Sequence, residues 1–371
     1  MRKKVIIDTD PSADDAIALM LAMASPELEI LGMTAASGVC EASRSLCNIM
    51  RIQELWGCTG IPAVKGAEMP LLRSLCCDDA YCGADGLSET DLPLPVKKAY
   101  PGTAADFIVQ MAHCFPGEIT LISLAPMTNV ALALKAEPSL PKFIREIITI
   151  DGNYALWRYG KEMQESKRIS LNQHSRNREA VSQAKEGFSV CADGASLVML
   201  PPARMERPEW NILQDPEAAE MVFASGIPIR AAGLDVTACF GNWMIDQLLK
   251  NDGKSNHQNG PEQEAEQEAQ LCSASQKKSA ARLFLQKAVS FNLRRGLEPY
   301  SLLVDSAAIA LAIDPQLCEM MEGHASVCTK GKETGNICFA NGKEGTGSPV
   351  FAAQTFDFAR FLRLLKERIF V

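Results

Sequence analysis

Short apolar runs alternate with amphipathic stretches along the first third of the chain. Residues 5–7 and 28–34 are rich in β-branched and aliphatic side chains, which predicts buried strands, while residues 16–24 and 41–56 have the spacing of helices. Further apolar runs predict strands at 119–124, 147–150 and 229–233. Because strands that alternate with helices form βαβ units, the pattern predicts an α/β fold with an open, largely parallel central sheet flanked by helices, similar to a Rossmann core.

Two stretches interrupt this alternation. Residues 155–206 show little periodicity, and residues 251–280 are rich in Asn, Gln, Glu and Ser. Both are typical of insertions, the second forming either a mobile lid or a passive surface loop. Since no linker is evident, we expect residues 1–371 to form a single domain that carries these two peripheral insertions.

Composition and charge restrict the class of protein. Hydrophobic residues make up 47% of the chain, which is ample for a large core, and the formal net charge is -8. No basic block is dense enough to follow a phosphate backbone, so we expect no nucleic acid partner. No apolar run is long enough to span a bilayer or to form a signal-peptide core, so we expect a cytoplasmic protein without a membrane partner.

The chain contains 13 cysteines, an odd number, and none of them form a Cys-x-x-Cys pair. This pattern favours neither a disulfide framework nor a zinc site. We expect the cysteines to be buried free thiols in a reducing compartment, where an unpaired cysteine packs as a small hydrophobic residue.

The densest chemical feature lies directly behind the first predicted strand, where Asp8, Asp10, Asp14 and Asp15 fall within eight positions. Like charges this close repel one another unless a cation or shared protons neutralise them, so the cluster predicts a bound partner. Carboxylates suit calcium or magnesium, and no histidine or cysteine lies nearby to favour zinc.

The local sequence predicts how these acids are arranged. Pro11 fixes a turn and Ser12 is expected to cap a helix that begins at about Ala13. Asp14 and Asp15 then lie in the first helical turn, where the positive end of the helix dipole favours carboxylates. Adjacent helical residues point about 100° apart, so we expect one acid to bind the metal and the other to contact a bound ligand.

Ends of the later predicted strands carry further candidates, since ligands bind beyond the carboxyl ends of strands in open parallel sheets. Leu124, Asp151 and Asp235 lie at or near such ends. Thr128 or Asn129 is expected to cap the helix that follows Leu124.

The acidic run, Asp8-Thr-Asp-Pro-Ser-Ala-Asp-Asp-Ala16, resembles the amino-terminal Asp-x-Asp-Pro-Gly-x-Asp-Asp-Ala motif of the inosine-uridine-preferring nucleoside hydrolase family. Further segments resemble motifs of that family in the same order: Leu124-Ala-Pro-Met-Thr-Asn129, Glu209-Trp-Asn211, Asp215-Pro-Glu-Ala-Ala219, Gly233-Leu-Asp-Val-Thr237 and Val304-Asp305. The resemblance spans nearly the whole chain apart from the two insertions.

This resemblance implies an enzyme that hydrolyses the N-glycosidic bond of a ribonucleoside in a calcium-dependent reaction and releases the base and ribose. It implies that one Ca²⁺ is bound by Asp10, Asp15, Asp305 and the backbone carbonyl of Leu124, and that Asp10 is the general base toward the attacking water. By analogy with the family, we expect a homodimer or homotetramer.

The resemblance also implies the residues that bind the small-molecule nucleoside. Asp14 is expected to bind the 2′-hydroxyl of the ribose, and Glu209 and Asn211 the 3′ and 5′ side of the sugar. Asp8 is expected to brace the loop rather than to touch the substrate. Carboxylates around the ribosyl ring suit a transition state with oxocarbenium character.

Three positions depart from the family pattern. Val39 replaces an asparagine of the sugar site, and Val304 and Cys82 each replace a histidine. These changes leave the expected metal ligands intact but remove groups near the leaving base, so the nucleobase preference stays open. Three aromatic residues could face the base, although core packing is the simpler role for each: Tyr300, Trp157 and Trp210.

Two other functions stay open. The same departures are compatible with a family member that binds a ribosyl ligand but has lost turnover. A haloacid-dehalogenase-like phosphatase also begins with an apolar strand and Asp-x-Asp, with Asp8 as nucleophile and Asp10 as acid and base. That scheme leaves Asp14 and Asp15 without a role, and the chain has no convincing later lysine and paired-acid motif.

Overall fold

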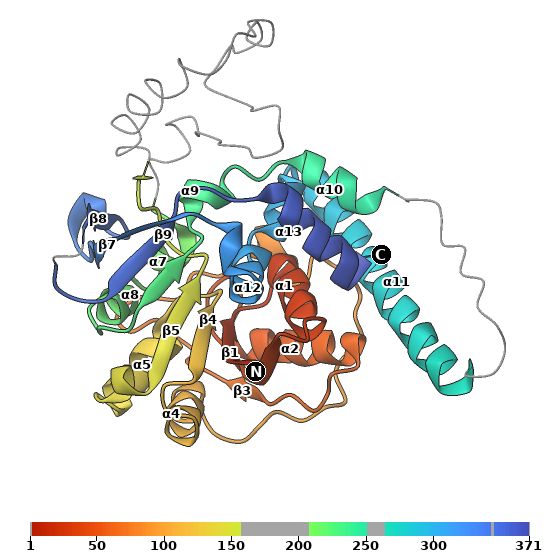
Figure 1. Cartoon of the computed structure of the whole chain (residues 1–371), viewed down its shortest axis with the longest axis horizontal. Coiled ribbons are helices and arrows are strands. Elements are labelled where there is room, and N and C mark those ends of the chain that lie inside the picture. Colours follow the sequence, from red (N-terminus) through yellow and green to blue (C-terminus); the bar gives the residue numbers. More distant parts are fainter. Residues whose placement is uncertain (1, 157–207, 251–263, 343–344, 371) are drawn as a thin grey trace, which may run out of the picture.

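The computed structural model describes residues 2–156, 208–250, 264–342 and 345–370 (Figure 1). Within these residues, nine strands form one sheet in the order β3-β2-β1-β4-β5-β6-β9-β7-β8. The pairs from β3 to β9 in this order are parallel, whereas β7 pairs antiparallel with β9 and β8. The predicted α/β fold with a largely parallel central sheet is therefore confirmed.

All five predicted strands are present, and four further strands complete the sheet. Their bounds are β1 Lys3–Thr9, β2 Leu28–Ala35, β3 Ala63–Lys65, β4 Ile119–Ser123, β5 Ile144–Thr149, β6 Ile229–Ala231, β7 Met320–Val327, β8 Ile337–Asn341 and β9 Pro349–Ala353. The three predicted helices of the first half correspond to α1, α2 and α5.

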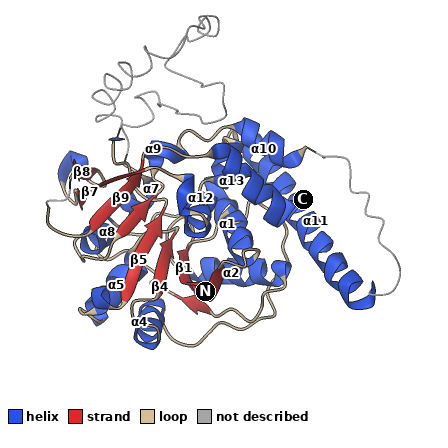
Figure 2. Cartoon of the chain, in the orientation of Figure 1, coloured by secondary structure: helices blue, strands red, loops and turns tan. Residues whose placement is uncertain are grey.

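Helices lie on both faces of the sheet (Figure 2). The main ones are α1 Ala13–Met23, α2 Ala42–Trp56, α3 Asp79–Cys82, α4 Ala104–Cys114, α5 Thr128–Ala136, α7 Trp210–Gln214, α8 Pro216–Phe223, α9 Leu234–Thr237, α10 Asn242–Leu249, α11 Glu264–Arg295, α12 Ser306–Ile313 and α13 Phe358–Leu365. In the parts of the chain that are described, none of the helices combines the length and apolarity needed to cross a bilayer.

Most of the core consists of two apolar clusters separated by the sheet. Val5 and Ile7 of β1 belong to the cluster that includes residues of α1, α2, α11, α12 and α13, whereas Ile6 belongs to the cluster that includes α4, α5 and α8. Successive side chains of a strand point to opposite faces, and a parallel sheet is covered on both. This explains why residues 5–7 of β1 are apolar without interruption.

The structure tests only part of the two predicted insertions. Most of residues 155–206 and residues 251–263 lie outside the described residues. Residues 264–280, however, belong to helix α11, so the prediction of a loop or lid is wrong for that part. Its Glu, Gln, Ala and Lys residues are strong helix formers, and their polar character was mistaken for that of a loop.

The cysteines found in the described part of the chain are free thiols, as expected. Only Cys40 and Cys82 among them are buried, so the prediction of burial is wrong for the other described cysteines, which are partly or fully exposed.

Candidate active site

A cavity of about 300 Å³ lies at the carboxyl ends of the parallel strands. It is lined by the loop after β1 and the start of α1, the loops after β2, β4 and β5, and the segments around α3, α7 and α12. The lining residues are Asp10, Ser12, Asp14, Asp15, Val39, Asp78, Tyr81, Leu124, Ile150, Glu209, Trp210, Asn211, Ser301, Val304 and Asp305. The set contains all the residues for which the family resemblance implies a catalytic, metal-binding or sugar-binding role, but not the strand-end candidates Asp151 and Asp235.

Helix α1 begins in the predicted place, with Ser12 as its N-cap residue. The capping contact is made by Asp15, whose Oδ2 accepts a hydrogen bond from the Ser12 backbone N–H at 3.0 Å. The other oxygen of Asp15 accepts from the Thr9 hydroxyl at 2.5 Å, and the Ser12 hydroxyl donates to Asp14. The turn therefore fixes both acids before any ligand binds.

Asp14, Asp15 and Asp305 bring ligand oxygens within 4.8 Å of one another and could hold a metal ion. Burial, followed by the charge of Asp14, raises the pKa of Asp15 to about 7. Burial and the charge of Asp15 raise the pKa of Asp305 well above its usual range. A buried set of carboxylate oxygens with mutually raised pKa values fits a hard divalent cation, since the ion would neutralise the repulsion.

Asp10 faces the same cavity but is not in that close group. Its Oδ2 accepts a hydrogen bond from the Val39 backbone N–H at 2.6 Å. A Cβ atom on Gly38 would lie 2.1 Å from the same oxygen, so only glycine fits beside Asp10. Burial, and then the charge of Asp15, raises the pKa of Asp10 well above its usual range.

Glu209 and Asn211, which also line the cavity, are held by the start of α7. Glu209 is the N-cap residue, and its carboxylate accepts from the backbone N–H groups of Asn211 and Ile212 at 2.9 and 3.0 Å. The Asn211 side-chain amide donates to the carbonyl oxygen of Leu124 at 3.2 Å. Burial raises the pKa of Glu209.

Asp8 does not line the cavity, in agreement with its expected bracing role. Its Oδ1 accepts from the Thr34 hydroxyl at 2.5 Å and from the Asn129 amide at 2.8 Å, which ties β1 to β2 and α5. Burial raises the pKa of Asp8 to about 6.

The prediction that Thr128 or Asn129 caps α5 is wrong, because Met127 is the N-cap residue and both polar side chains bind buried acids instead.

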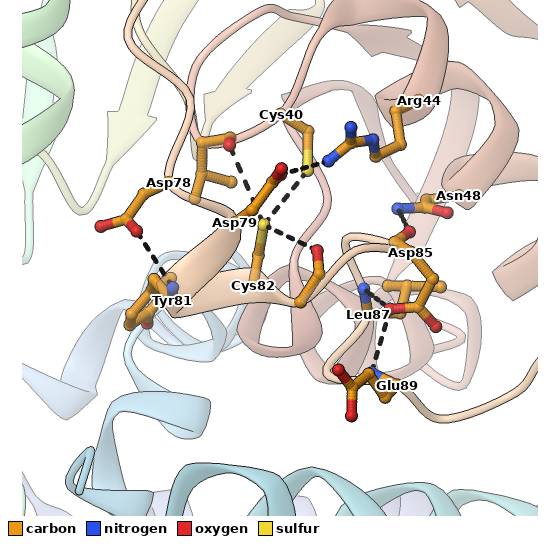
Figure 3. A network of polar contacts seen from close by, with 12 residues as sticks. Cys40, Arg44, Asn48, Asp78, Asp79, Tyr81, Cys82, Asp85, Leu87 and Glu89 are labelled. Atoms are coloured by element: carbon orange, nitrogen blue, oxygen red, sulfur yellow. Dashed lines mark hydrogen bonds and ion pairs between the residues drawn. The ribbon is translucent and has the colours of Figure 1, made fainter. Parts of the chain in front are cut away.

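Tyr81 was missed by the sequence analysis. Its hydroxyl donates to Asp14 Oδ2 at 2.9 Å, so both oxygens of Asp14 have protein partners. Figure 3 shows the surrounding segment, in which the Cys82 thiol lies 3.6 Å from that of Cys40 and Arg44 donates to Asp79 at 2.6 Å. A signal was present in the sequence, because Tyr81 directly precedes Cys82, the position at which the family pattern has a histidine.

The remaining strand-end acids do not reach the cavity. Asp235 accepts from the backbone N–H groups of Tyr154 and Leu156 at 2.8 and 2.7 Å and fixes that segment, while Asp151 is bound to Asn211. Of the three aromatic candidates, Trp210 lines the cavity, Tyr300 does not, and Trp157 lies outside the described residues.

Comparison with known proteins gives relatives over most of the chain. A pyrimidine-specific ribonucleoside hydrolase from Enterobacter sp. (strain 638) is 35% identical over 237 residues, which cover 64% of this chain and 61% of that protein, less than two thirds of its length. A probable uridine nucleosidase 2 from Arabidopsis thaliana is 28% identical over 382 residues and covers 99% of this chain and 98% of that protein.

Solved structures give the same picture. A plant nucleoside hydrolase superposes with a TM-score of 0.72 at 26% identity, covering 100% of this chain and 99% of that one. An inosine-guanosine nucleoside hydrolase shares the fold with a TM-score of 0.71 at 22% identity, covering 100% of both chains. The model of the family described as inosine-uridine preferring nucleoside hydrolase matches residues 5–363, and the chain therefore belongs to that family.

Proposed function

We propose that this protein hydrolyses the N-glycosidic bond of a ribonucleoside and that it requires calcium. The observation that carries the proposal is the convergence of Asp14 and Asp15 with Asp305, almost 300 positions further along the chain, in one acidic group that lines the cavity. Membership of the family and the names of the relatives support the same substrate class.

We assign the ion to Asp10, Asp15, Asp305 and the Leu124 carbonyl, all of which line the cavity. Asp14 belongs to the same close group and accepts hydrogen bonds from Ser12 and Tyr81. We assign it to the ribose 2′-hydroxyl rather than to the ion because that is the role which the resemblance to the family implies. When bound, calcium would lower the pKa of a coordinated water and neutralise the carboxylates.

Asp10 is the proposed general base. Its Oδ2 is held by the Val39 N–H, which leaves Oδ1 as the oxygen that can accept a proton from water. Removing a general base costs a factor of about 10² to 10⁴ in rate.

The proposed sugar contacts are Asp14, Glu209 and Asn211. The carboxylates of Asp14 and Glu209, with those of the metal set, surround the ribosyl ring with negative charge, which stabilises an oxocarbenium-like transition state. Val39 and Val304 line the same cavity and offer no side-chain proton donor, so the departing base relies on other groups.

Two alternatives lead to different results in one assay. A binding-only family member would take up a ribosyl ligand and release no base, as Val39 and Val304 suggest. The phosphatase alternative loses support because the chain belongs to the nucleoside hydrolase family.

We further propose a single domain, a cytoplasmic location and a homodimeric or homotetrameric assembly.

The test is incubation of the purified protein with purine and pyrimidine nucleosides, with calcium or with excess chelator, followed by chromatography of the released base. We expect calcium-dependent release by the wild type and by Asp235→Asn, whose buried acid lies outside the cavity, and none above background by Asp10→Ala. Equal release by Asp10→Ala in chelator would overturn the proposal, and ligand binding without release would establish the binding-only alternative.

A further inference from the structure

Asp151 lies just behind the wall of the cavity. It follows β5, is fully buried, and does not line the cavity itself. Its backbone N–H donates to the Thr149 hydroxyl at 2.9 Å, and its Oδ1 accepts from Asn211 Nδ2 at 2.8 Å. Burying a carboxylate lowers the stability of the fold unless hydrogen bonds compensate for the lost hydration. The hydrogen bond to Asn211 is therefore expected to serve the fold or the site.

The Asn211 amide nitrogen has two hydrogens and both are used. One goes to the Leu124 carbonyl oxygen at 3.2 Å and the other to Asp151 Oδ1 at 2.8 Å. A backbone carbonyl cannot donate in any protonation state, so a flipped amide would place the Asn211 oxygen against an acceptor. The amide therefore has one satisfied orientation, and Asp151 and Leu124 define it together.

The consequence concerns what Asn211 can offer a ligand. Because both donors face the protein, the side-chain oxygen is the amide group left for the cavity that Asn211 lines. An amide that offers only its acceptor selects a ligand group that donates, and a sugar hydroxyl is such a group.

We propose that Asp151 is a positioning residue that fixes Asn211 as a hydrogen-bond acceptor toward one hydroxyl of the ribosyl group, and thereby sets selectivity for sugars that carry that hydroxyl. This inference rests on the proposed function. It assigns Asp151 a role through Asn211 and no contact with the substrate.

The kinetic test uses uridine, 3′-deoxyuridine and 5′-deoxyuridine as substrates. Asn211→Ala shows which hydroxyl Asn211 binds, because the loss of kcat/KM should be smallest for the analogue that lacks that hydroxyl. We expect Asp151→Ala to lower kcat/KM for uridine by about tenfold, the value of one hydrogen bond, and to leave that same analogue nearly unaffected. Asp151→Asn keeps an acceptor for Asn211 and should restore most of the loss.

The control is Asp235→Ala, which removes a buried acid of the adjacent segment that is not bonded to Asn211. It should lower stability without changing the ratio of kcat/KM for uridine to that for either analogue. The inference would be overturned if Asp151→Ala lowered kcat/KM equally for all three substrates. It would also be overturned if the analogue spared by Asp151→Ala differed from the analogue spared by Asn211→Ala.

A second readout does not need turnover. The two side-chain amide protons of Asn211, assigned by their absence in the Asn211→Ala spectrum of ¹⁵N-labelled protein, should both be protected from exchange in the wild type. One should lose protection in Asp151→Ala and keep it in Asp151→Asn. Unprotected protons in the wild type would refute the positioning role, whereas protected protons with no base release would refute only the proposed function.

Discussion

Asp305→Asn should stabilise the metal-free protein, and calcium should remove most of that advantage. The change is isosteric and removes one negative charge from the close group of Asp14, Asp15 and Asp305. Two like charges 4.8 Å apart repel by about 3 kcal/mol at an effective dielectric constant of about 20. Asp305 is ionised in the unfolded chain at pH 8, so on folding the wild type bears either the repulsion from an ionised neighbour or the cost of taking up a proton, and asparagine avoids both. We therefore expect the metal-free variant to be more stable by about 3 kcal/mol at pH 8.

The pKa of Asp15 leads to a similar magnitude. A rise from 3.8 to about 7 in the folded state corresponds to about 4 kcal/mol of lost stability for the ionised form. With calcium at about 100 times its dissociation constant, the wild type should gain about 2.7 kcal/mol and the variant, lacking one proposed ligand, much less. The difference in unfolding free energy between the two proteins should therefore shrink from about 3 kcal/mol to nearly zero when calcium is added.

The assay is urea unfolding followed by circular dichroism at pH 8, in excess chelator and in millimolar calcium. Asp235→Asn is the matched control, because Asp235 accepts two backbone hydrogen bonds outside the acidic group and its loss should destabilise the protein in both conditions. A metal-free Asp305→Asn protein less stable than the wild type, or equal calcium stabilisation of both, would refute the electrostatic argument.

Three more predictions follow from the same site. Gly38→Ala forces a clash with Asp10 and should reduce base release at least tenfold, whereas Gly60→Ala, with open space around its Cβ, should not. Tyr81→Phe removes one hydrogen bond to Asp14 and should raise KM for nucleosides by roughly three- to tenfold, measured by initial rates. Metal-free wild-type protein should lose stability as pH rises from about 4 to about 7, because folding raises the pKa of Asp15 and the folded state therefore binds the proton more tightly than the unfolded state. Calorimetry across this range should show a falling melting temperature, and a constant melting temperature would refute this reasoning.

The sequence predicted five strands of the parallel part of the sheet because they are largely buried and read as apolar runs. The three-residue strand β3 and strand β9, which pairs parallel with β6, were not predicted. The antiparallel edge was missed. Residues of β7 alternate between buried and partly exposed, and β8 is mostly exposed, so neither forms a continuous apolar segment. Helix α11 was missed for a related reason, since its polar composition hides a strong helical propensity.

At the site, the predicted residues converge because motifs at strand ends meet at one edge of a parallel sheet. What the sequence could not predict was the contacts between elements far apart in the chain. Tyr81 reaches Asp14 from α3, and Asp151 reaches Asn211 from the end of β5. Each of these contacts depends on loop conformation, which neither periodicity nor motif spacing specifies.

The backbone hydrogen bond to Asp10 has an evolutionary consequence. Its partner at position 39 is a peptide N–H, and position 124 likewise contributes a peptide oxygen to the cavity wall, so neither contact depends on the side chain present there. Valine can thus replace asparagine at position 39 while the hydrogen bond to Asp10 is kept, and most other residues at that position should also keep it. Proline is the exception, because it has no N–H to donate, and saturation mutagenesis of codon 39 should single it out.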